Sequence, residues 1–570
     1  MRDDQNPKKL NDIGEAYFTG LKMDKNIEIA YSYFKQAADQ QNPIGYYNVS
    51  RYFVEKGDYK EAVINLQKSL SLGYSKAALL LAEMALDGVG MHKSKSKAFK
   101  YVSEAASQND IDGYNILANY HMKGIGTKKD PKKAWEYFQK SADMGNTEGM
   151  YQLGVLFLSA KQNQKNMESA LHWLDKAATH LHKEAILTIK KLYDTGHSYF
   201  SKKSVSHLKE MSFYYEELLA RTNDIPSLRN VSLTYYHGSS ITKSNYEKAF
   251  HYFQILEKLH DEVGAYGMGL CYLYAKGTPQ DVEKASELLK YAAMKNYPNA
   301  LTKLGDIERS DALHPANYEA AKDYYFEAAK QNDSEALMNL GLLHYRNQIL
   351  SSTNDLAYQY MEQSSAKGNN QAYYWLGIFH EKGIGTKQSI NLAEKAFEKA
   401  IDAGNIGAKF KYASLLFEEV KKSRKPSKKQ LQTIKKALSM FLEYLNDSDS
   451  SSTNRLFSMA YIAEAFSQGL GVKKSDRAAR YWTERAASAG LSSHMLIMYQ
   501  LLKDQEFENA YDWLQKAIKQ NDLGEAYYEL GNLYFDGTYG FEKDEKKARN
   551  YYETSAKMKC SKAVEKLMMI

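Results

Sequence analysis

One stretch of sequence, residues 123–146 (KGIGTKKDPKKAWEYFQKSADMGN), recurs in modified form along the whole chain. It predicts a glycine-containing loop followed by a helix in which Ala134, Tyr137 and Phe138 share one face, because they lie three and four residues apart. Related stripes occur at residues 30–38, 98–106, 170–178, 285–293, 321–329, 510–517 and 548–556. A repeat of this length predicts a helical-repeat protein, since each unit buries its apolar face only by stacking on its neighbours.

Each unit also begins with an apolar residue followed by a small one, as in Leu153-Gly154, Leu304-Gly305 and Leu530-Gly531. Glycine inside a helix costs about 1 kcal/mol relative to alanine, so its recurrence requires a reason. We expect a second helix to approach closely at this position, with an aromatic residue about three positions later wedged between the two helices. About fifteen such units of roughly 37 residues fit the chain. The fold class predicted is all-α, a right-handed α-α superhelix (solenoid) of helix-turn-helix units with a concave inner surface.

The combined frame, A-x3-L-G-x2-Y-x2-G-x-G followed by K-A-x2-Y-F-x-K-A-A-x2-G, resembles the Sel-one-like repeat (SLR) family, relatives of tetratricopeptide repeats. Its G-x-G loops occur at residues 88–90, 124–126, 383–385 and 469–471. The resemblance covers nearly the whole chain. It implies a non-catalytic scaffold or adaptor for protein-protein interaction, in bacterial signalling, envelope or host-interaction assemblies or in eukaryotic quality-control complexes.

Departures from the frame suggest boundaries. Lys190 takes the small position of the sixth unit and Tyr499 that of the fourteenth, and residues 418–436 form a long interruption. We expect three blocks of repeats joined by two flexible segments, the last block ending in a cap at 562–570. The blocks are residues 1–183, 227–417 and 456–570, and the segments between them are the degenerate repeat 184–226 and the basic-then-acidic stretch 418–455.

Composition narrows the functional classes. The net charge is +7, from 76 basic and 69 acidic residues, so a mixed surface is expected and nucleic acid is disfavoured as a partner. Two cysteines, Cys271 and Cys560, are too few for a disulfide framework or a cysteine zinc site. The polar start and the lack of a long apolar segment predict a cytoplasmic protein without membrane insertion. A secreted effector or a trimmed chain stays open as an alternative, and the oligomeric state is not predicted.

No catalytic, cofactor-binding or metal-binding residue is predicted, and the chain is not expected to be an enzyme. The S-x-x-K matches at Ser94 and Ser240 lack the companion motifs of penicillin-binding enzymes. The neighbouring His180 and His182 lack the H-E-x-x-H frame of zinc proteases. Two alternatives to the scaffold are an inhibitor or immunity protein that sequesters one partner and, from another class, a hydrolase of cell-wall or β-lactam type.

The partner-binding surface is expected on the concave side, lined by the first helix of each unit. Positions two before, two after and five after the apolar residue of each pair should face inward. In the middle units they form an apolar, aromatic stripe of the kind that binds peptides, weakened where Thr302, Asp306 and Arg309 interrupt it. The predicted groove residues are Tyr236, Tyr266, Leu270, Leu273, Met338, Leu342, Tyr345, Tyr374, Ile378, Phe410 and Phe417. The alternative is that these residues pack sideways between adjacent first helices.

A second possible contact surface is a run of basic residues within the long interruption. Its members are Lys421, Lys422, Arg424, Lys425, Lys428 and Lys429. The run is interpreted either as a solvated loop or helix extension, or as a docking patch for an acidic or phosphorylated partner or for nucleic acid.

Overall fold

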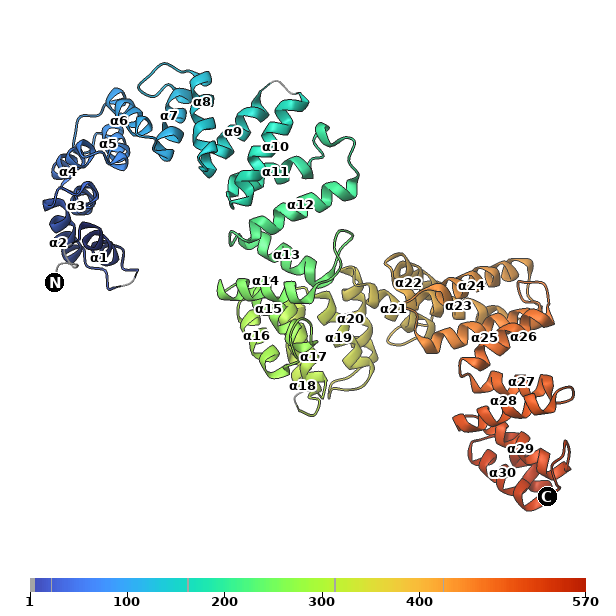
Figure 1. Cartoon of the computed structure of the whole chain (residues 1–570). Coiled ribbons are helices and arrows are strands. Elements are labelled where there is room, and N and C mark those ends of the chain that lie inside the picture. Colours follow the sequence, from blue (N-terminus) through green and yellow to red (C-terminus); the bar gives the residue numbers. More distant parts are fainter. Residues whose placement is uncertain (1–5, 22, 161–162, 312–313, 424) are drawn as a thin grey trace. The chain divides into compact units, whose positions relative to one another are not determined.

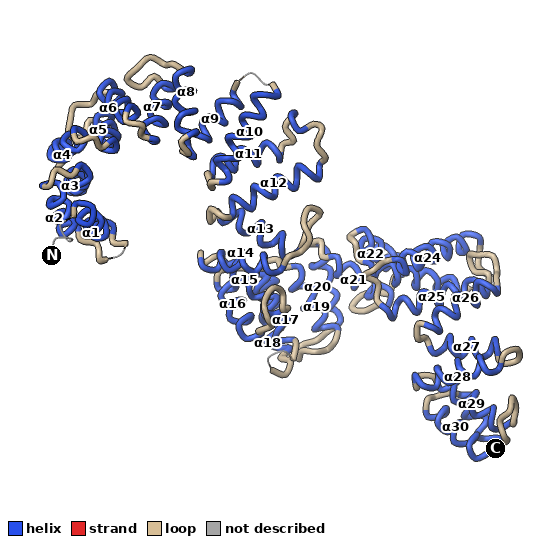
Figure 2. The backbone as a smooth tube through the Cα atoms, in the orientation of Figure 1, coloured by secondary structure: helices blue, strands red, loops and turns tan. Residues whose placement is uncertain are grey.

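The computed structural model describes residues 6–21, 23–160, 163–311, 314–423 and 425–570, and within these ranges every regular element is a helix. The chain divides into two compact units, residues 1–292 and 293–570. Within each unit, helices that follow one another in sequence lie side by side (Figures 1 and 2). The expected all-α solenoid of helix-turn-helix hairpins is confirmed.

The first unit contains α1 (Pro7–Thr19), α2 (Ile27–Asp39), α3 (Pro43–Lys56), α4 (Tyr59–Ser71), α5 (Ser75–Asp87), α6 (Lys95–Ser107), α7 (Ile111–Lys123), α8 (Pro131–Asp143), α9 (Thr147–Ser159), α10 (Gln164–Thr179), α11 (Lys183–Asp194), the short 3₁₀ helix η2 (Ser198–Phe200), α12 (Val205–Ala220), α13 (Ile225–His237), α14 (Tyr246–Lys258), α15 (Glu262–Leu273) and most of α16 (Val282–Met294).

The second unit contains α17 (Pro298–Arg309), α18 (Tyr318–Lys330), α19 (Ser334–Tyr345), α20 (Asn354–Ala366), α21 (Asn370–Lys382), α22 (Ile390–Asp402), α23 (Ile406–Lys421), α24 (Lys428–Asn446), α25 (Ser452–Gln468), α26 (Asp476–Ser488), α27 (Ser492–Leu502), α28 (Phe507–Gln520), α29 (Gly524–Asp536), α30 (Glu545–Lys557) and α31 (Ser561–Met569).

The number of hairpins matches the sequence pattern. Helices α1 to α30 form fifteen consecutive pairs, and α31 follows the last of them. Both segments expected to depart from the repeat contain helices: α11 and α12 occupy most of 184–226, and the end of α23 and α24 occupy most of 418–455. The division into three blocks with flexible joints stays a prediction.

The small residue of each first helix has the role expected from the sequence. A side-chain carbon built on Gly14 would lie 2.5 Å from a ring carbon of Phe34. At Gly305 the same carbon would lie 2.6 Å from the Tyr325 ring. These distances are shorter than van der Waals contact, so only glycine lets the large residue of the second helix pack against the first helix.

The wedge aromatics also lie where the pattern places them, between the helices of a pair. The rings of Tyr17 on α1 and Tyr33 on α2 are stacked with centroids 6.2 Å apart. Tyr534 on α29 stacks on Tyr551 of α30 at 5.7 Å. Alanines on the second helices, such as Ala134, are fully buried, so large and small side chains interdigitate along the core.

Each G-x-G loop joins the two helices of one hairpin and contacts the hairpin before it. Gly126, in the loop between α7 and α8, has a φ of +67°, and a side-chain carbon there would collide with the carbonyl oxygen of Lys95 at the start of α6. Gly90 is pressed in the same way against Tyr59 at the start of α4, and Gly385 against Asn354 at the start of α20. The loop of one hairpin therefore rests on the second helix of the preceding hairpin.

Candidate functional site

The predicted groove residues are for the most part core residues. Eight of them are at most 8% exposed: Tyr236, Tyr266, Leu270 and Leu273 in the first unit, and Leu342, Ile378, Phe410 and Phe417 in the second. The other three, Met338, Tyr345 and Tyr374, are half-buried. Neighbouring helices cover them, so an open apolar stripe is not present at these positions. That any of them binds a partner stays a prediction.

The contact of Tyr345 matches the alternative interpretation, in which these residues pack sideways between adjacent first helices, whereas Phe410 packs within its own hairpin. Tyr345 on α19 lies with its ring centroid 5.8 Å from Trp375 on α21, the next first helix. Phe410 on α23 lies 6.0 Å from Phe441 on α24. The periodicity of one helix gives the direction of a side chain, but it does not show that the adjacent hairpin covers it.

The basic run is largely solvated, and part of it forms ion pairs. Lys421 pairs with Glu464 at 2.7 Å, and Lys422 pairs with Glu419. Lys425, Lys428 and Lys429 are exposed. Arg424 lies outside the described residues. The last two lysines begin α24, which Ser427 caps, so the run is in part a helix start and not a loop.

A hollow of about 940 Å³ lies in the second unit between the first helices α25 and α27, with α26 behind them. Three large apolar side chains on its walls are exposed to solvent: Phe457 (43%), Ile497 (39%) and Leu501 (50%). Ile497 and Leu501 are four residues apart on α27 and so lie on one face. Apolar side chains concentrated at a concave surface are typical of an interaction site.

Small residues account for the space. Ala460 and Ala463 on α25 line the hollow, together with Ala479 and Thr483 on α26. Helix α26 begins after Ser475, whose hydroxyl accepts a hydrogen bond from the Ala478 backbone N–H at 3.2 Å. The alanines that let α26 pack closely against α25 also leave the region between α25 and α27 unfilled.

Two arginines on α26 supply uncompensated positive charge at this hollow. Arg477 and Arg480 are three residues apart and exposed, and neither forms an ion pair with any described residue. The carboxylate of Glu464 is engaged, because Lys421 pairs with it at 2.7 Å and the side-chain amide of Gln468 donates to it at 3.0 Å. Asp476 occupies the first turn of α26, where the helix dipole favours a negative charge.

His494 completes the polar part of the lining. Burial lowers the pKa of its imidazole, and the nearby Glu464 carboxylate opposes that shift only in part. The ring is therefore neutral at pH 7, so one ring nitrogen donates and the other accepts; Nδ1 already lies 3.3 Å from the Ser493 hydroxyl. The hollow thus offers apolar anchors, a neutral imidazole and two free guanidinium groups.

A second hollow of about 540 Å³ lies in the first unit, beside α11, α12 and α13. Lys190 on α11 and Glu216 on α12 line it and pair at 3.2 Å, and Lys190 also pairs with Asp194 at 2.7 Å. Burial opposes the positive charge of Lys190, but these carboxylates outweigh it and raise the pKa of the ammonium. Because the charges satisfy one another, this hollow offers a partner less free charge than the one at α25 and α27.

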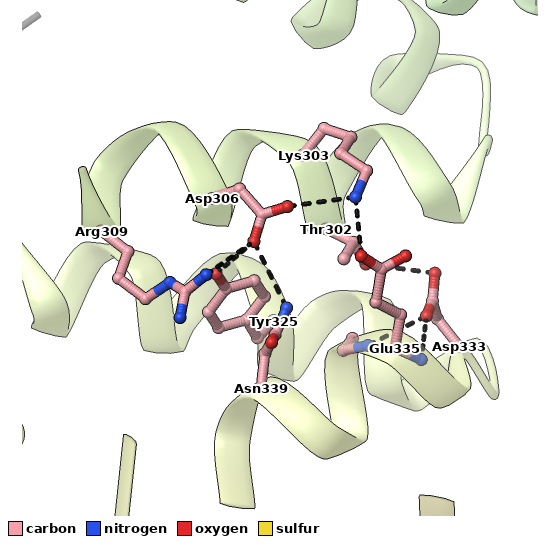
Figure 3. A network of polar contacts seen from close by, with 9 residues as sticks. Thr302, Lys303, Asp306, Arg309, Tyr325, Asp333, Glu335 and Asn339 are labelled. Carbon is pink, nitrogen blue, oxygen red and sulfur yellow. Dashed lines mark hydrogen bonds and ion pairs between the residues drawn. The ribbon is translucent and has the colours of Figure 1, made fainter. Parts of the chain in front are cut away.

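A polar network connects side chains of α17, α18 and α19 (Figure 3). The Asp306 carboxylate accepts hydrogen bonds from the Tyr325 hydroxyl at 2.7 Å and from the Asn339 amide at 3.3 Å. Lys303 bridges Asp306 at 3.1 Å and Glu335 at 2.7 Å. The network joins two hairpins and satisfies its own charges, so we interpret it as structural.

The groups that could suggest metal binding or catalysis have the following surroundings in the part of the chain that the structure describes. No group of three or more potential metal-binding side chains occurs there. The Ser94 hydroxyl accepts from the backbone N–H of Lys97 at 3.2 Å, so this S-x-x-K match is a helix cap. Burial raises the pKa of the Cys271 thiol to about 12, which makes it a poor nucleophile. No described helix combines the length and apolar character needed to cross a bilayer.

Sequence reasoning found part of the hollow at α25 and α27. Applied to the pair Ile462-Ala463, the inward-facing rule places Glu464 and Ser467 on its wall. It missed Phe457, Ile497 and Leu501, because these residues do not occupy the positions that the rule counts. The available signal was Tyr499, which departs from the small-residue rule on α27 itself.

Comparison with known proteins agrees with this architecture. The family model described as Sel1 repeat matches thirteen segments, so the chain belongs to the Sel1 repeat family. The segments are residues 10–42, 44–74, 75–110, 111–146, 147–180, 225–258, 263–297, 298–333, 334–369, 370–405, 456–491, 498–522 and 524–560. The two hairpins left unmatched are α11–α12 and α23–α24, two of the three that the sequence marks as irregular; the third, α27–α28, is matched from residue 498 on.

Solved structures with similar folds share little sequence with the chain. One is c5321, a protective antigen of uropathogenic Escherichia coli with an SLR fold, at 18% identity, covering all of this chain and 96% of that one, with a TM-score of 0.36. Another is a Sel1 repeat protein from Oxalobacter formigenes, at 20% identity, covering 50% and 98%, with a TM-score of 0.23. A third is the immunity protein Pa5087 of Pseudomonas aeruginosa, at 16% identity, covering 38% and 81%, with a TM-score of 0.28. A comparison with curated proteins gave no match.

Proposed function

We propose that this protein is a non-catalytic scaffold that binds a protein partner, and that the hollow at α25 and α27 is a binding surface. The observation that carries the proposal is the combination of exposed Phe457, Ile497 and Leu501 with the unpaired Arg477 and Arg480 at one concave place. Aromatic, aliphatic and arginine side chains of this kind supply most of the binding energy at protein interfaces. Membership of a repeat family whose proteins generally mediate protein-protein interaction supports the same conclusion.

Site-specific photo-crosslinking tests the proposal. A photoreactive phenylalanine analogue in place of Leu501 on the full chain, expressed in its native cells, should crosslink a discrete partner. The same analogue in place of Leu392 is the matched control, because Leu392 is 46% exposed in the same unit but lies outside the hollow. A partner crosslinked through position 501 and not through 392 supports the proposal. Equal crosslinking at both positions, or none at 501, contradicts it.

Loss of the apolar anchors provides the second arm of that test. The double variant Ile497→Ser and Leu501→Ser should no longer retain the partner, whereas Leu392→Ser should retain it. Ile497, Leu501 and Leu392 are all partly exposed. The substitutions therefore leave the buried core residues, such as Met498 on α27, unchanged. Circular dichroism of both variants checks that the helices persist.

A further inference from the structure

The lining of the hollow at α25 and α27 restricts the kind of partner segment that can bind there. This inference rests on the proposed function and extends it. Its volume of about 940 Å³ is at the upper end of what small-molecule sites have. Its walls are helices that expose apolar side chains on two sides, Phe457 from α25 and Ile497 with Leu501 from α27. A segment with one continuous apolar face, such as an amphipathic helix, fits such a groove.

Charge sets the polar face of that segment. Arg477 and Arg480 lie on the same face of α26, because residues three apart are neighbours on a helix. Both are exposed, and no described carboxylate pairs with either. Free guanidinium groups bind carboxylates through paired hydrogen bonds, which is the strongest contact that this site can make.

The local carboxylates do not compensate for the two arginines. Lys421 and Gln468 already occupy Glu464, and Asp476 lies at the positive end of α26. These same carboxylates argue against a nucleic-acid backbone as occupant, because closely spaced phosphates would meet them as well as the arginines. An apolar face combined with a few acidic groups agrees with the lining better than a polyanion does.

We infer that the hollow at α25 and α27 binds an acidic amphipathic helical segment of a protein partner. Its apolar side chains contact Phe457, Ile497 and Leu501, and its carboxylates contact Arg477 and Arg480. Specificity then arises from charge, since a basic segment with the same apolar face meets two uncompensated arginines.

Fluorescence anisotropy with designed peptides tests this inference on the full chain. Two labelled helical peptides share one leucine face and carry either glutamates or lysines on the other face. The glutamate peptide should bind, and added salt should weaken its binding. In Arg477→Glu/Arg480→Glu its affinity should fall about tenfold or more, as expected when charge-assisted contacts are replaced by repulsion. The lysine peptide should bind that variant better than the wild-type chain.

The matched control is Lys473→Glu/Lys474→Glu. These two lysines are exposed in the loop just before α26, outside the hollow, and the change in net charge is the same. Binding of the glutamate peptide should be nearly unchanged in this variant. Equal loss in both double variants, equal binding of the two peptides, absence of binding, or tighter binding of a single-stranded oligonucleotide would overturn the inference.

The peptide and crosslinking experiments separate two kinds of failure. If position 501 crosslinks a partner in cells but Arg477→Glu/Arg480→Glu retains that partner, the scaffold proposal holds and the acidic-segment inference fails. If position 501 crosslinks no partner and neither peptide binds, both fail. If the partner is found and the arginine variant releases it, both hold.

Discussion

Lys190 and Glu216 replace, in the α11–α12 hairpin, the glycine and the large apolar residue that meet in other hairpins, with their charged atoms 3.2 Å apart. Glu216 is 9% exposed, and it occupies the place on α12 that Leu174 has on α10 and Phe138 has on α8. Removing the lysine alone leaves a buried carboxylate with a weaker set of partners. Such a loss costs about 1–3 kcal/mol, so Lys190→Ala should destabilise the hairpin.

The compensating substitution sharpens this prediction. Lys190→Ala/Glu216→Leu recreates the small-and-apolar pair of the regular hairpins, so the double variant should recover most of the lost stability. Hydrogen exchange of the α11 and α12 amides, measured by mass spectrometry on the full chain, reports the change locally, which suits a repeat array that need not unfold in one step. A double variant that exchanges as fast as Lys190→Ala would show that the pair does not act as a unit.

In the α17–α18 hairpin, the contact between the first and the second helix includes a hydrogen bond from the Tyr325 hydroxyl to Asp306. Tyr325 is fully buried, and its hydroxyl donates to Asp306 at 2.7 Å; Asn532 accepts in the same way from Tyr552 at 2.9 Å. Asp306→Ile should destabilise α17–α18 by about 1–3 kcal/mol, because it leaves the hydroxyl buried without its acceptor. Asp306→Ile/Tyr325→Phe reproduces the Ile378 and Phe397 pair of another hairpin and should recover the part of the stability that the buried hydroxyl costs, while the contacts of Asn339 and Lys303 with Asp306 stay lost. Hydrogen exchange of the α17 and α18 amides tests this prediction. The amides of the single variant should exchange faster than those of the double variant, and equal rates would contradict it.

Three histidines, His121, His344 and His380, occupy the wedge position that is usually aromatic, and all are at most 8% exposed with an unpartnered Nδ1. Burial lowers the pKa of all three. The positive charge of Lys133 lowers the pKa of His121 further, and the carboxylate of Asp130 opposes this shift. In the same way Lys322 lowers the pKa of His344 further, and Glu319 opposes the shift. Glu362 partly opposes the shift at His380.

These shifts give the protein an acid-sensitive core. Because the folded-state pKa values lie below the ordinary value near 6.5, the unfolded chain binds protons first as pH falls. The stability contributed by the neutral rings is complete above about pH 7 and decreases as pH falls below 6.5. The triple variant His121→Phe/His344→Phe/His380→Phe should keep its helical signal to lower pH, whereas His251→Phe, at an exposed histidine, should follow the wild type. Coincident acid transitions by circular dichroism for all three proteins would contradict this.

The exposed lysines of the basic run should behave differently from Lys436, which lies beyond the run on α24. Lys425, Lys428 and Lys429 are exposed, so changing all three to glutamine should leave the thermal midpoint unchanged within error. Lys436 instead donates to Glu398 at 3.0 Å and to the Tyr412 hydroxyl at 3.1 Å. Lys436→Gln should therefore increase hydrogen exchange at α22–α24. Any partner that binds in a salt-sensitive way through the run should be lost in the triple variant, while the fold is retained.

The repeat pattern was sufficient to predict the hairpins, because glycine opposite Phe34, Leu174 or Tyr325 leaves a signature that spacing alone displays. It also identified Lys190 as an exception, but not its partner, since Glu216 is recognised only once α12 is aligned with the regular stripes. The exposure expected of the groove residues was wrong for a different reason. Whether Phe410 or Tyr236 is exposed depends on the tilt of the next hairpin, which many weak contacts determine together.

The same dependence explains why the hollow at α25 and α27 was not predicted. Its walls follow from the small residues Ala460 and Ala463 on α25 and Thr483 on α26 acting together, and none of them departs from the family pattern. Arg477 and Arg480 read in sequence as ordinary solvated charges. Only the arrangement in space shows that no described carboxylate forms an ion pair with either of them.

The seating of Gly126 on Lys95 gives the array a polarity. In each G-x-G loop the second glycine lies against the second helix of the preceding hairpin, as Gly90 and Gly385 also do. Removing hairpins from the C-terminal side should thus leave the contact of every remaining loop intact. Removing them from the N-terminal side takes away the helix against which the first remaining loop packs. The ribosome synthesises the chain from the N-terminus, so the helix that each loop packs against is synthesised before the loop itself.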